Sequence, residues 1–264
     1  MAFEPIAIVG RGCVLPGCLT PDALWQAVVE KRSLLSSPAP GLWGISDLDQ
    51  AEGTPKGGFV TGFADVFDPA RPEYEVLDVG RLDPVAQWLL HAGGEAWREA
   101  GIQDAAPDRI AVIIGNLSYP SRGFSNFAAD VWLERTGTKD PRNRFNSGYP
   151  AQALAQSIGA NGPTFALDAA CASSLYAIKL ACDRLQDRSV DVALAGAVQA
   201  ADSLIINRGF AALQALSPTG RTRPLVEGAD GLVPAEDAAA IVLKRLSDIS
   251  PGERVHGVIR SVGL

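Results

Sequence analysis

A short segment, Asp168-Ala-Ala-Cys-Ala-Ser-Ser174, decides how this chain is interpreted. It follows the apolar run Thr164-Phe-Ala-Leu167 and precedes a helical pattern over 175–185, with only small residues around the cysteine. This order predicts a strand, a sharp turn and a helix, with the Cys171 thiol at the turn. The positive end of a helix dipole and its free backbone N–H groups favour a thiolate. Because a thiolate is the form that attacks a carbonyl carbon, the segment indicates covalent acyl chemistry.

The residues alone leave two interpretations of Cys171 open, a nucleophile and a buried, inert thiol. Its position directly after a strand and its small neighbours favour the nucleophile. A serine hydrolase would carry G-x-S-x-G at such an elbow, but here the elbow residue is a cysteine between Ala170 and Ala172. We interpret Ser173 and Ser174 as first-turn residues that hold or pack against the turn.

Composition narrows the class of protein. The chain has 264 residues, of which 47% are hydrophobic and 20% charged, so we expect a globular protein with a filled core. A net charge of −7 argues against nucleic acid or an anionic membrane as the main partner. No apolar run is long enough to span a bilayer, and the N-terminus resembles a first strand rather than a signal peptide. We therefore expect a cytoplasmic protein.

The other cysteines and the two histidines give no second site. Cys13, Cys18 and Cys182 form no C-x-x-C pair, so a zinc site and a disulfide framework are both disfavoured. We expect free thiols, with Cys182 a small core residue. His91 falls on a predicted helix and His256 on a predicted strand, away from other titratable groups, and we interpret both as structural.

Strands and helices alternate along most of the chain. The pattern predicts helices over 21–30, 83–100, 150–158 and 172–186, and strands over 6–9, 109–115, 164–168, 191–196, 238–243 and 255–262. Residues 33–80 are expected to form surface loops, and residues 116–147 carry weak signals. Continuous apolar strands that alternate with helices predict an α/β fold with a largely parallel sheet covered on both faces.

A glycine pair after the first strand invites a nucleotide-binding interpretation that the spacing does not support. In Gly10-Arg-Gly-Cys-Val-Leu-Pro16 the third glycine of G-x-G-x-x-G would fall at position 15, which is Leu15. No P-loop sequence is present either. We therefore expect Gly10 and Gly12 to form a tight structural turn.

Several ordered blocks closely resemble a β-ketoacyl synthase of the thiolase-like superfamily. The cysteine block is Leu167-Asp-Ala-Ala-Cys-Ala-Ser-Ser-Leu175, and the later blocks are Ala193-Leu-Ala-Gly-Ala197, Ala215-Leu-Ser-Pro-Thr-Gly-Arg-Thr-Arg-Pro224 and Ala229-Asp-Gly-Leu-Val-Pro-Ala-Glu236. The opening strand with Gly10 to Gly17, and Arg81-Leu-Asp-Pro84, also fit. The resemblance covers almost the whole chain and is closest to type I polyketide and polyunsaturated fatty acid synthases.

The resemblance implies a layered α-β-α-β-α fold of which this chain holds the N-terminal half. That half, residues 1–250, should carry a mostly parallel mixed five-stranded sheet, and residues 251–264 should be the first strand of the C-terminal half. The family also implies a homodimer, with the strand at 164–167 near the interface.

The resemblance also implies a mechanism. Cys171 would accept an acyl chain from the phosphopantetheine thioester of an acyl carrier protein, with no cofactor bound by the chain itself. The carbanion formed by decarboxylation of malonyl-carrier protein would then attack the acyl-enzyme, giving a 3-ketoacyl thioester two carbons longer. The backbone N–H of Cys171 would form half of an oxyanion hole. Phe210 matches a family position that lines the acyl pocket.

This chain departs from the family pattern in three places. Ala235-Glu236-Asp237 stands where the family commonly has G-E-G, and Leu225-Val226 stands where it has Phe-Asp. We expect the charge of Asp237 to disturb a tight turn before the next strand. The family's two catalytic histidines and its lysine belong to H-G-T-G-T-like and N-x-G-H-like segments of the second half, which these 264 residues do not contain.

Three interpretations follow. The chain is a piece of a longer condensing enzyme, or the nucleophile-bearing half of a split synthase completed by another chain, or a non-enzymatic remnant that binds a carrier protein or synthase partner. The intact thiol favours the first two. We expect the missing half, in cis or in trans, to be required for condensation, and apolar surface to be exposed where that half would pack.

Overall fold

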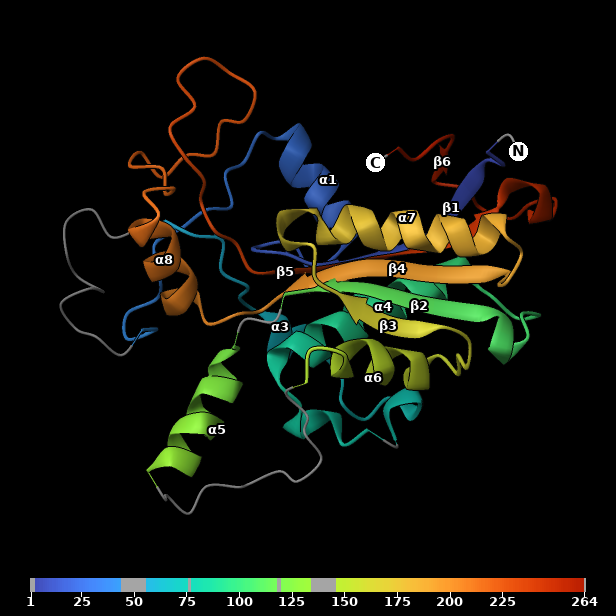
Figure 1. The fold of residues 1–264 in the computed structure, drawn as a ribbon, viewed down its shortest axis with the longest axis horizontal. Helices are drawn as coiled ribbons and strands as arrows, with labels where there is room; N and C mark the ends of the chain where they lie inside the picture. Colours follow the sequence, from blue (N-terminus) through green and yellow to red (C-terminus); the bar gives the residue numbers. More distant parts are fainter. Residues whose placement is uncertain (1–2, 44–55, 76, 118–119, 134–145, 264) are drawn as a thin grey trace.

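A computed structural model describes residues 3–43, 56–75, 77–117, 120–133 and 146–263. A six-stranded sheet in the order β3-β2-β4-β5-β1-β6 forms its centre (Figure 1). The strands are β1 Ile6–Val14, β2 Ile110–Asn116, β3 Thr164–Leu167, β4 Val192–Gln199, β5 Asp237–Arg245 and β6 Gly257–Ile259. Each strand overlaps a run that the sequence predicts.

The sheet is less parallel than we expected. Strand β2 is parallel to β3 and β4, but β4–β5, β5–β1 and β1–β6 are antiparallel. The expectation of a mostly parallel sheet is therefore wrong. A parallel neighbour requires a crossover to the opposite end of the sheet, whereas the segment after β4 returns at the same end and β5 runs back beside β4. Apolar strands covered on both faces do not reveal that direction.

The sixth strand is the last of the predicted ones, shortened to three residues. Ile6 pairs with Ile259 and Ile8 pairs with Gly257, so β6 extends this sheet at the edge opposite to β3. The expectation of five strands is therefore wrong. The sheet has a sixth strand, β6, which lies in the segment expected to belong to the C-terminal half.

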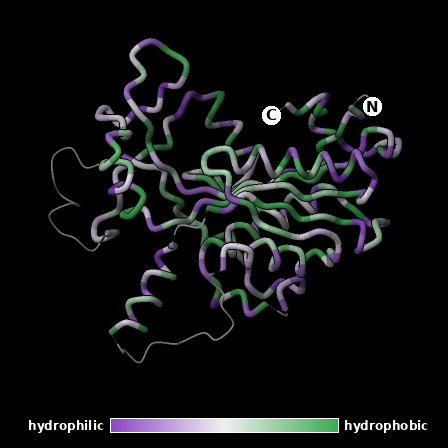
Figure 2. Tube along the Cα trace, in the orientation of Figure 1, coloured by the Kyte–Doolittle hydropathy of each residue, from purple (hydrophilic) through white to green (hydrophobic). Residues whose placement is uncertain are grey.

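Helices cover both faces of the sheet. Helices α4 (Pro84–Ala100) and α6 (Tyr149–Ser157) lie on one face, and α7 (Ser173–Gln186) lies on the other (Figure 1). The core is accordingly divided in two, with Leu89 and Leu154 on the α4 side and Ala181 and Leu185 on the α7 side. Hydrophobic residues follow the central strands (Figure 2). The layered α/β class is confirmed.

Helix α4 shows why its boundaries could be predicted. The Asp83 side chain accepts a hydrogen bond from the Val85 backbone at 3.1 Å, and Pro84 occupies the first turn. Gly101 ends the helix at a φ of 58°. These are the N-cap and C-terminal signals that the sequence displays.

Gly10 and Gly12 do not form the expected turn. Both lie inside β1, and a Cβ at these positions would come within 2.0 Å of the Ala96 carbonyl oxygen and 1.9 Å of the Ala92 carbonyl oxygen. Glycine is required here because α4 packs directly against the strand backbone.

Several short helices lie outside the predicted elements. They are α3 Phe63–Val66, α5 Arg122–Trp132 and α8 Ser203–Ala212, with 3-10 turns at Pro72–Tyr74 and Val79–Arg81, while α1 Pro21–Val29 matches its prediction. The predicted loop regions also include 44–55, 76, 118–119 and 134–145, which lie outside the described residues. None of the described helices is both long and apolar enough to cross a bilayer.

Candidate active site

Cys171 lies in a 3-10 turn, Ala170–Ala172, between the end of β3 and the start of α7. Its side chain is exposed. The predicted order of strand, turn and helix is confirmed, with α7 beginning one residue later than expected. The alternative of a buried thiol is wrong, and the nucleophile role remains a prediction.

The turn before Cys171 has an unusual backbone. Ala170 has a φ of 50°, a left-handed conformation that costs an alanine about 1–2 kcal/mol. Its N–H donates to Asp168 Oδ1 at 2.9 Å, and its carbonyl accepts from Ser173 Oγ at 2.7 Å. Ser173 Oγ in turn accepts from the Ala169 N–H at 2.9 Å. These three hydrogen bonds hold the strained turn and place Cys171 at its apex.

The first turn of α7 sits directly on the sheet. A Cβ on Gly115 of β2 would lie 2.8 Å from the carbonyl carbon of Ser173, so only glycine allows this approach. Ser173 is buried, which confirms that it holds the turn rather than offering a second nucleophile. The sequence predicted Cys171 but not its positioning residues. An aspartate directly after a strand is the signal that could have indicated the Asp168 turn.

The other three thiols are placed differently. Cys13, Cys18 and Cys182 are all buried. Burial raises the pKa of Cys13 and of Cys182 to about 11. The expectation that Cys182 is a core residue is confirmed, and Cys171 is the exposed one of the four cysteines.

Neither histidine lies with Cys171. His91 is buried on the α4 side of the sheet, where its ring and that of Phe63 form a T-shaped pair with their centroids 5.6 Å apart. His256 lies just before β6, at the edge of the sheet opposite to β3, and its backbone N–H donates to the Ile8 carbonyl oxygen. Burial lowers the pKa of both imidazoles. The expectation that both lie away from other titratable groups is wrong for His256, because its Nε2 lies 3.2 Å from Glu99 Oε1.

The carboxyl ends of β2, β3 and β4 meet at one end of the sheet because these strands are parallel. Cys171 follows β3 at this end, and α8 follows β4 there. Phe210 is a half-buried residue of α8, so the fold brings the two predicted site residues to the same end. The role of Phe210 in an acyl pocket stays a prediction.

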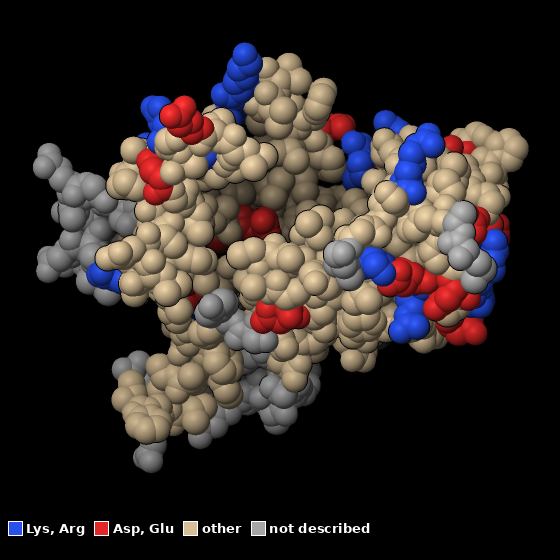
Figure 3. All heavy atoms as spheres, turned by 45° about the horizontal axis from the view of Figure 1, so that its top comes forward, with Lys and Arg blue, Asp and Glu red and all other residues tan. Residues whose placement is uncertain are grey.

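Two carboxyl groups stand at the same end, where β5 begins. The Glu236 carboxylate accepts a hydrogen bond from the Val60 N–H at 2.9 Å, and burial raises its pKa. Asp237 is the first residue of β5 and pairs in register with Gln199, so the strand itself begins regularly. Burial raises the pKa of Asp237 to about 6. The α7 side of the molecule is hollowed, and acidic atoms lie inside the hollow (Figure 3).

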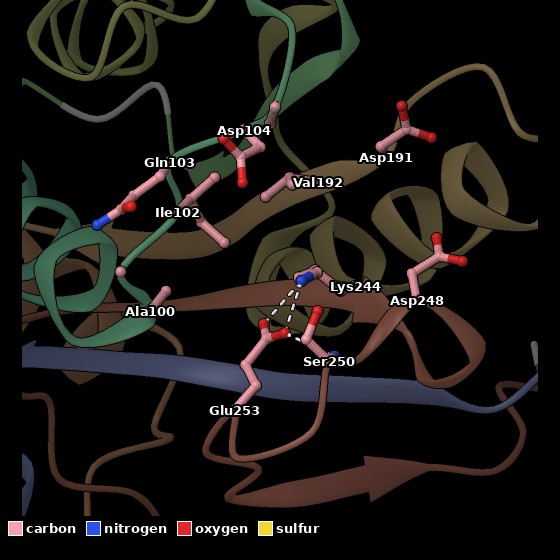
Figure 4. A pocket seen from close by; sticks show the side chains of 12 residues that line it. Ala100, Ile102, Gln103, Asp104, Asp191, Val192, Lys244, Asp248, Ser250 and Glu253 are labelled. Atoms are coloured by element: carbon pink, nitrogen blue, oxygen red, sulfur yellow. Dashed lines mark hydrogen bonds and ion pairs between the residues drawn. The ribbon is translucent and has the colours of Figure 1, made fainter.

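A second hollow lies at the opposite end of the sheet. It has a volume of about 440 Å³ and lies between the end of α4, the start of β4 and the segment after β5. Lys244 Nζ bridges both carboxylate oxygens of Glu253 at 2.7 and 2.9 Å, and Asp104 and Asp191 line the same hollow (Figure 4). The sequence held no signal for it, because its residues come from three stretches of the chain that are far apart in the sequence.

The model of the β-ketoacyl synthase N-terminal domain matches residues 3–249. The chain belongs to the β-ketoacyl synthase family. Its relatives include a phenolphthiocerol/phthiocerol polyketide synthase from Mycobacterium tuberculosis, 34% identical over 97% of this chain and 14% of the relative. A mycocerosic acid synthase-like polyketide synthase of Mycolicibacterium smegmatis is 32% identical over 97% of this chain and 12% of its own length.

Solved ketosynthases share the fold. The PfaC keto synthase–chain length factor superposes with a TM-score of 0.83 at 32% identity, covering 97% of this chain and 31% of that one. The oxazolomycin ketosynthase domain of Streptomyces albus gives a TM-score of 0.79 at 29% identity, covering 98% of this chain and 47% of that one. The ketosynthase resemblance and the thiolase-like fold are thereby confirmed, and the chain spans less than half of each of these relatives.

Proposed function

We propose that this chain is the acyl-accepting part of a 3-oxoacyl-[acyl-carrier-protein] synthase that acts in polyketide or fatty acid synthesis. The observation that carries the proposal is the exposed Cys171 at a strained strand-to-helix turn, in a chain of the ketosynthase family. The other thiols are buried, which leaves Cys171 as the accessible nucleophile among the cysteines.

In the first step the Cys171 thiolate attacks the carbonyl carbon of an acyl thioester on the phosphopantetheine of an acyl carrier protein. The C–S bond to phosphopantetheine breaks, and the released thiolate takes a proton from solvent. The Cys171 N–H, in the 3-10 turn before α7, would stabilise the oxyanion that forms in this step. In the second step malonyl-carrier protein loses carbon dioxide, and its carbanion displaces Cys171 from the acyl group.

We propose that the second step uses residues outside these 264, because both histidines of the chain lie away from Cys171. The exposed apolar residues on the outer face of α7 support the proposal that another domain covers this helix. Leu175 is 66% and Tyr176 is 38% exposed, although both belong to a helix that packs on the sheet. Large apolar side chains exposed side by side in this way mark a surface that packs against another domain.

We further propose a cytoplasmic homodimer joined near β3. This strand is at the edge of the sheet and pairs on one side only, with β2. An open edge strand carries unpaired backbone groups that a second copy can complete.

Labelling with cerulenin, a thiol-directed acyl analogue, tests the proposal. With the second half of a ketosynthase supplied in trans, peptide mass spectrometry should find the label on Cys171 and not on Cys13 or Cys182. Equal labelling of the buried cysteines would contradict the assignment. The purified chain alone should form no 3-ketoacyl product from acyl- and malonyl-carrier proteins, and product formation would overturn the need for a second half.

A further inference from the structure

A carboxyl group faces the side of the sheet on which Cys171 lies. Along β5, Ala238, Ala240 and Val242 belong to the core on the α4 side, while Leu243 belongs to the core on the α7 side. Side chains alternate along a strand, so Asp237 points to the α7 side. Its cross-strand partner Gln199 points the same way.

The face of β4 and β5 beside Asp237 carries small residues and is open to solvent. The next pair inward on this face is Ala197 of β4 and Ala239 of β5, and Ala239 is exposed. The first turn of α7 lies over Gly115 of β2. Strand β5 is two places from β2 in the sheet, which at about 4.8 Å per strand gives a lateral separation of roughly 10 Å. Asp237 is therefore within electrostatic reach of an acyl group on Cys171.

No counter-charge neutralises Asp237 among the described residues. Burial raises its pKa to about 6, and a hydrogen bond from the Gln199 backbone is the opposing influence. Above this pKa the carboxyl carries a negative charge. Charged groups at this end of the sheet include Asp168 after β3, Arg122 at the start of α5, Asp202 before α8, Arg208 of α8, Asp83 before α4 and Glu236.

We propose that Asp237 is a specificity-determining residue that disfavours acyl groups with a negative charge at Cys171 and leaves uncharged acyl chains unaffected. The proposal rests on the acyl-accepting function above. Its physical basis is that a fixed carboxylate beside the site repels an acyl group that ends in a carboxylate, such as succinyl, when that group is carried by Cys171. The family pattern has glycine here, so this discrimination belongs to this chain.

Two alkylating reagents measure the effect directly on the chain as it is. Iodoacetate and iodoacetamide react with the Cys171 thiolate by the same displacement of iodide, but only iodoacetate carries a negative charge. Because both reagents react with the same thiolate, the ratio of their rate constants does not depend on the fraction of Cys171 that is ionised at each pH. In low salt and above the pKa of Asp237, Asp237→Asn should raise the iodoacetate-to-iodoacetamide ratio about two- to fourfold.

The pH dependence has a definite sign. Below about pH 6 the Asp237 carboxyl takes up its proton, so the ratio in the unmodified chain should rise on acidification. In Asp237→Asn the ratio should not rise on acidification, because asparagine takes up no proton in this pH range. Asp104→Asn is the matched control, because Asp104 is exposed and lies at the opposite end of the sheet (Figure 4).

A rise of that size in Asp237→Asn with none in Asp104→Asn supports the proposal, and equal ratios in all three proteins at each pH overturn it. Thermal melting shows that each variant is folded. The alkylation ratios test only the proposed effect of Asp237, because alkylation requires an exposed thiol and no acyl transfer. The acyl-accepting function is tested separately, with an uncharged thioester, so failure of one claim can be told from failure of the other.

Discussion

The alanine before Cys171 adopts a backbone conformation that alanine normally avoids. Its left-handed φ turns the chain sharply between β3 and α7, and hydrogen bonds with Asp168 and Ser173 hold it there. Strain of this kind persists only where surrounding contacts maintain it, and it is concentrated at functional sites. Cys171 is thus exposed because the turn beneath it is fixed.

Replacement of Ala170 by glycine tests this strain. Glycine adopts a positive φ freely but loses more backbone entropy on folding, so Ala170→Gly should raise the free energy of unfolding by roughly 0.5–1 kcal/mol. Urea unfolding measures the change. The control is Ala106→Gly, at an exposed residue with a φ of −63°, which should lower stability by a similar amount. A loss in both variants would show that Ala170 is not strained.

Among the elements, helix α4 shows most clearly which terminal signals sequence reasoning can use. Helix α4 is framed by Asp83, Pro84 and Gly101, and all three have the predicted roles. Helices α5 and α8 contain Gly123 and Gly209, and glycine lowers helix propensity by about 1 kcal/mol. Both helices nevertheless have N-caps, because Ser121 Oγ accepts from the Phe124 N–H at 3.1 Å and Asp202 Oδ1 accepts from the Leu204 N–H at 3.0 Å.

The strands show a different limit. Their apolar runs predict where β2 and β4 lie, but strand direction depends on where the connecting segments return. That is why a largely parallel sheet was expected where three of the five pairings are antiparallel. The expectation that Gly10 and Gly12 form a turn is wrong for a similar reason. The helix whose close packing requires these glycines is about 80 residues away in the sequence.

The contact between β1 and α4 gives a prediction at this scale. Gly12→Ala would place a Cβ 1.9 Å from the Ala92 carbonyl oxygen, and neither backbone can move without separating helix and strand. We expect a loss of about 3 kcal/mol in the free energy of unfolding. Gly80→Ala is the matched control, because nothing lies within 4 Å of a Cβ there, and its stability should change by less than about 0.5 kcal/mol. Similar losses in both variants would contradict the packing argument.

For the molecule as a whole, the sequence predicts the nucleophile better than its surroundings. Small residues and a strand–turn–helix pattern indicate Cys171 without any structure. The arrangement of Phe210, Glu236 and Asp237 around one end of the sheet depends on the antiparallel return of β5, which is a property of the whole sheet. The acidic hollow of Figure 3 and the exposed outer face of α7 likewise arise only when distant segments fold together.

Acyl transfer to Cys171 is the central claim, and one measurement tests it most directly. The chain is incubated with an uncharged acyl thioester of N-acetylcysteamine, and its mass and peptides are then analysed by mass spectrometry. We predict one acyl group per chain, located on Cys171, and none on Cys171→Ala. No acylation, or equal acylation of Cys171→Ala, would contradict the account.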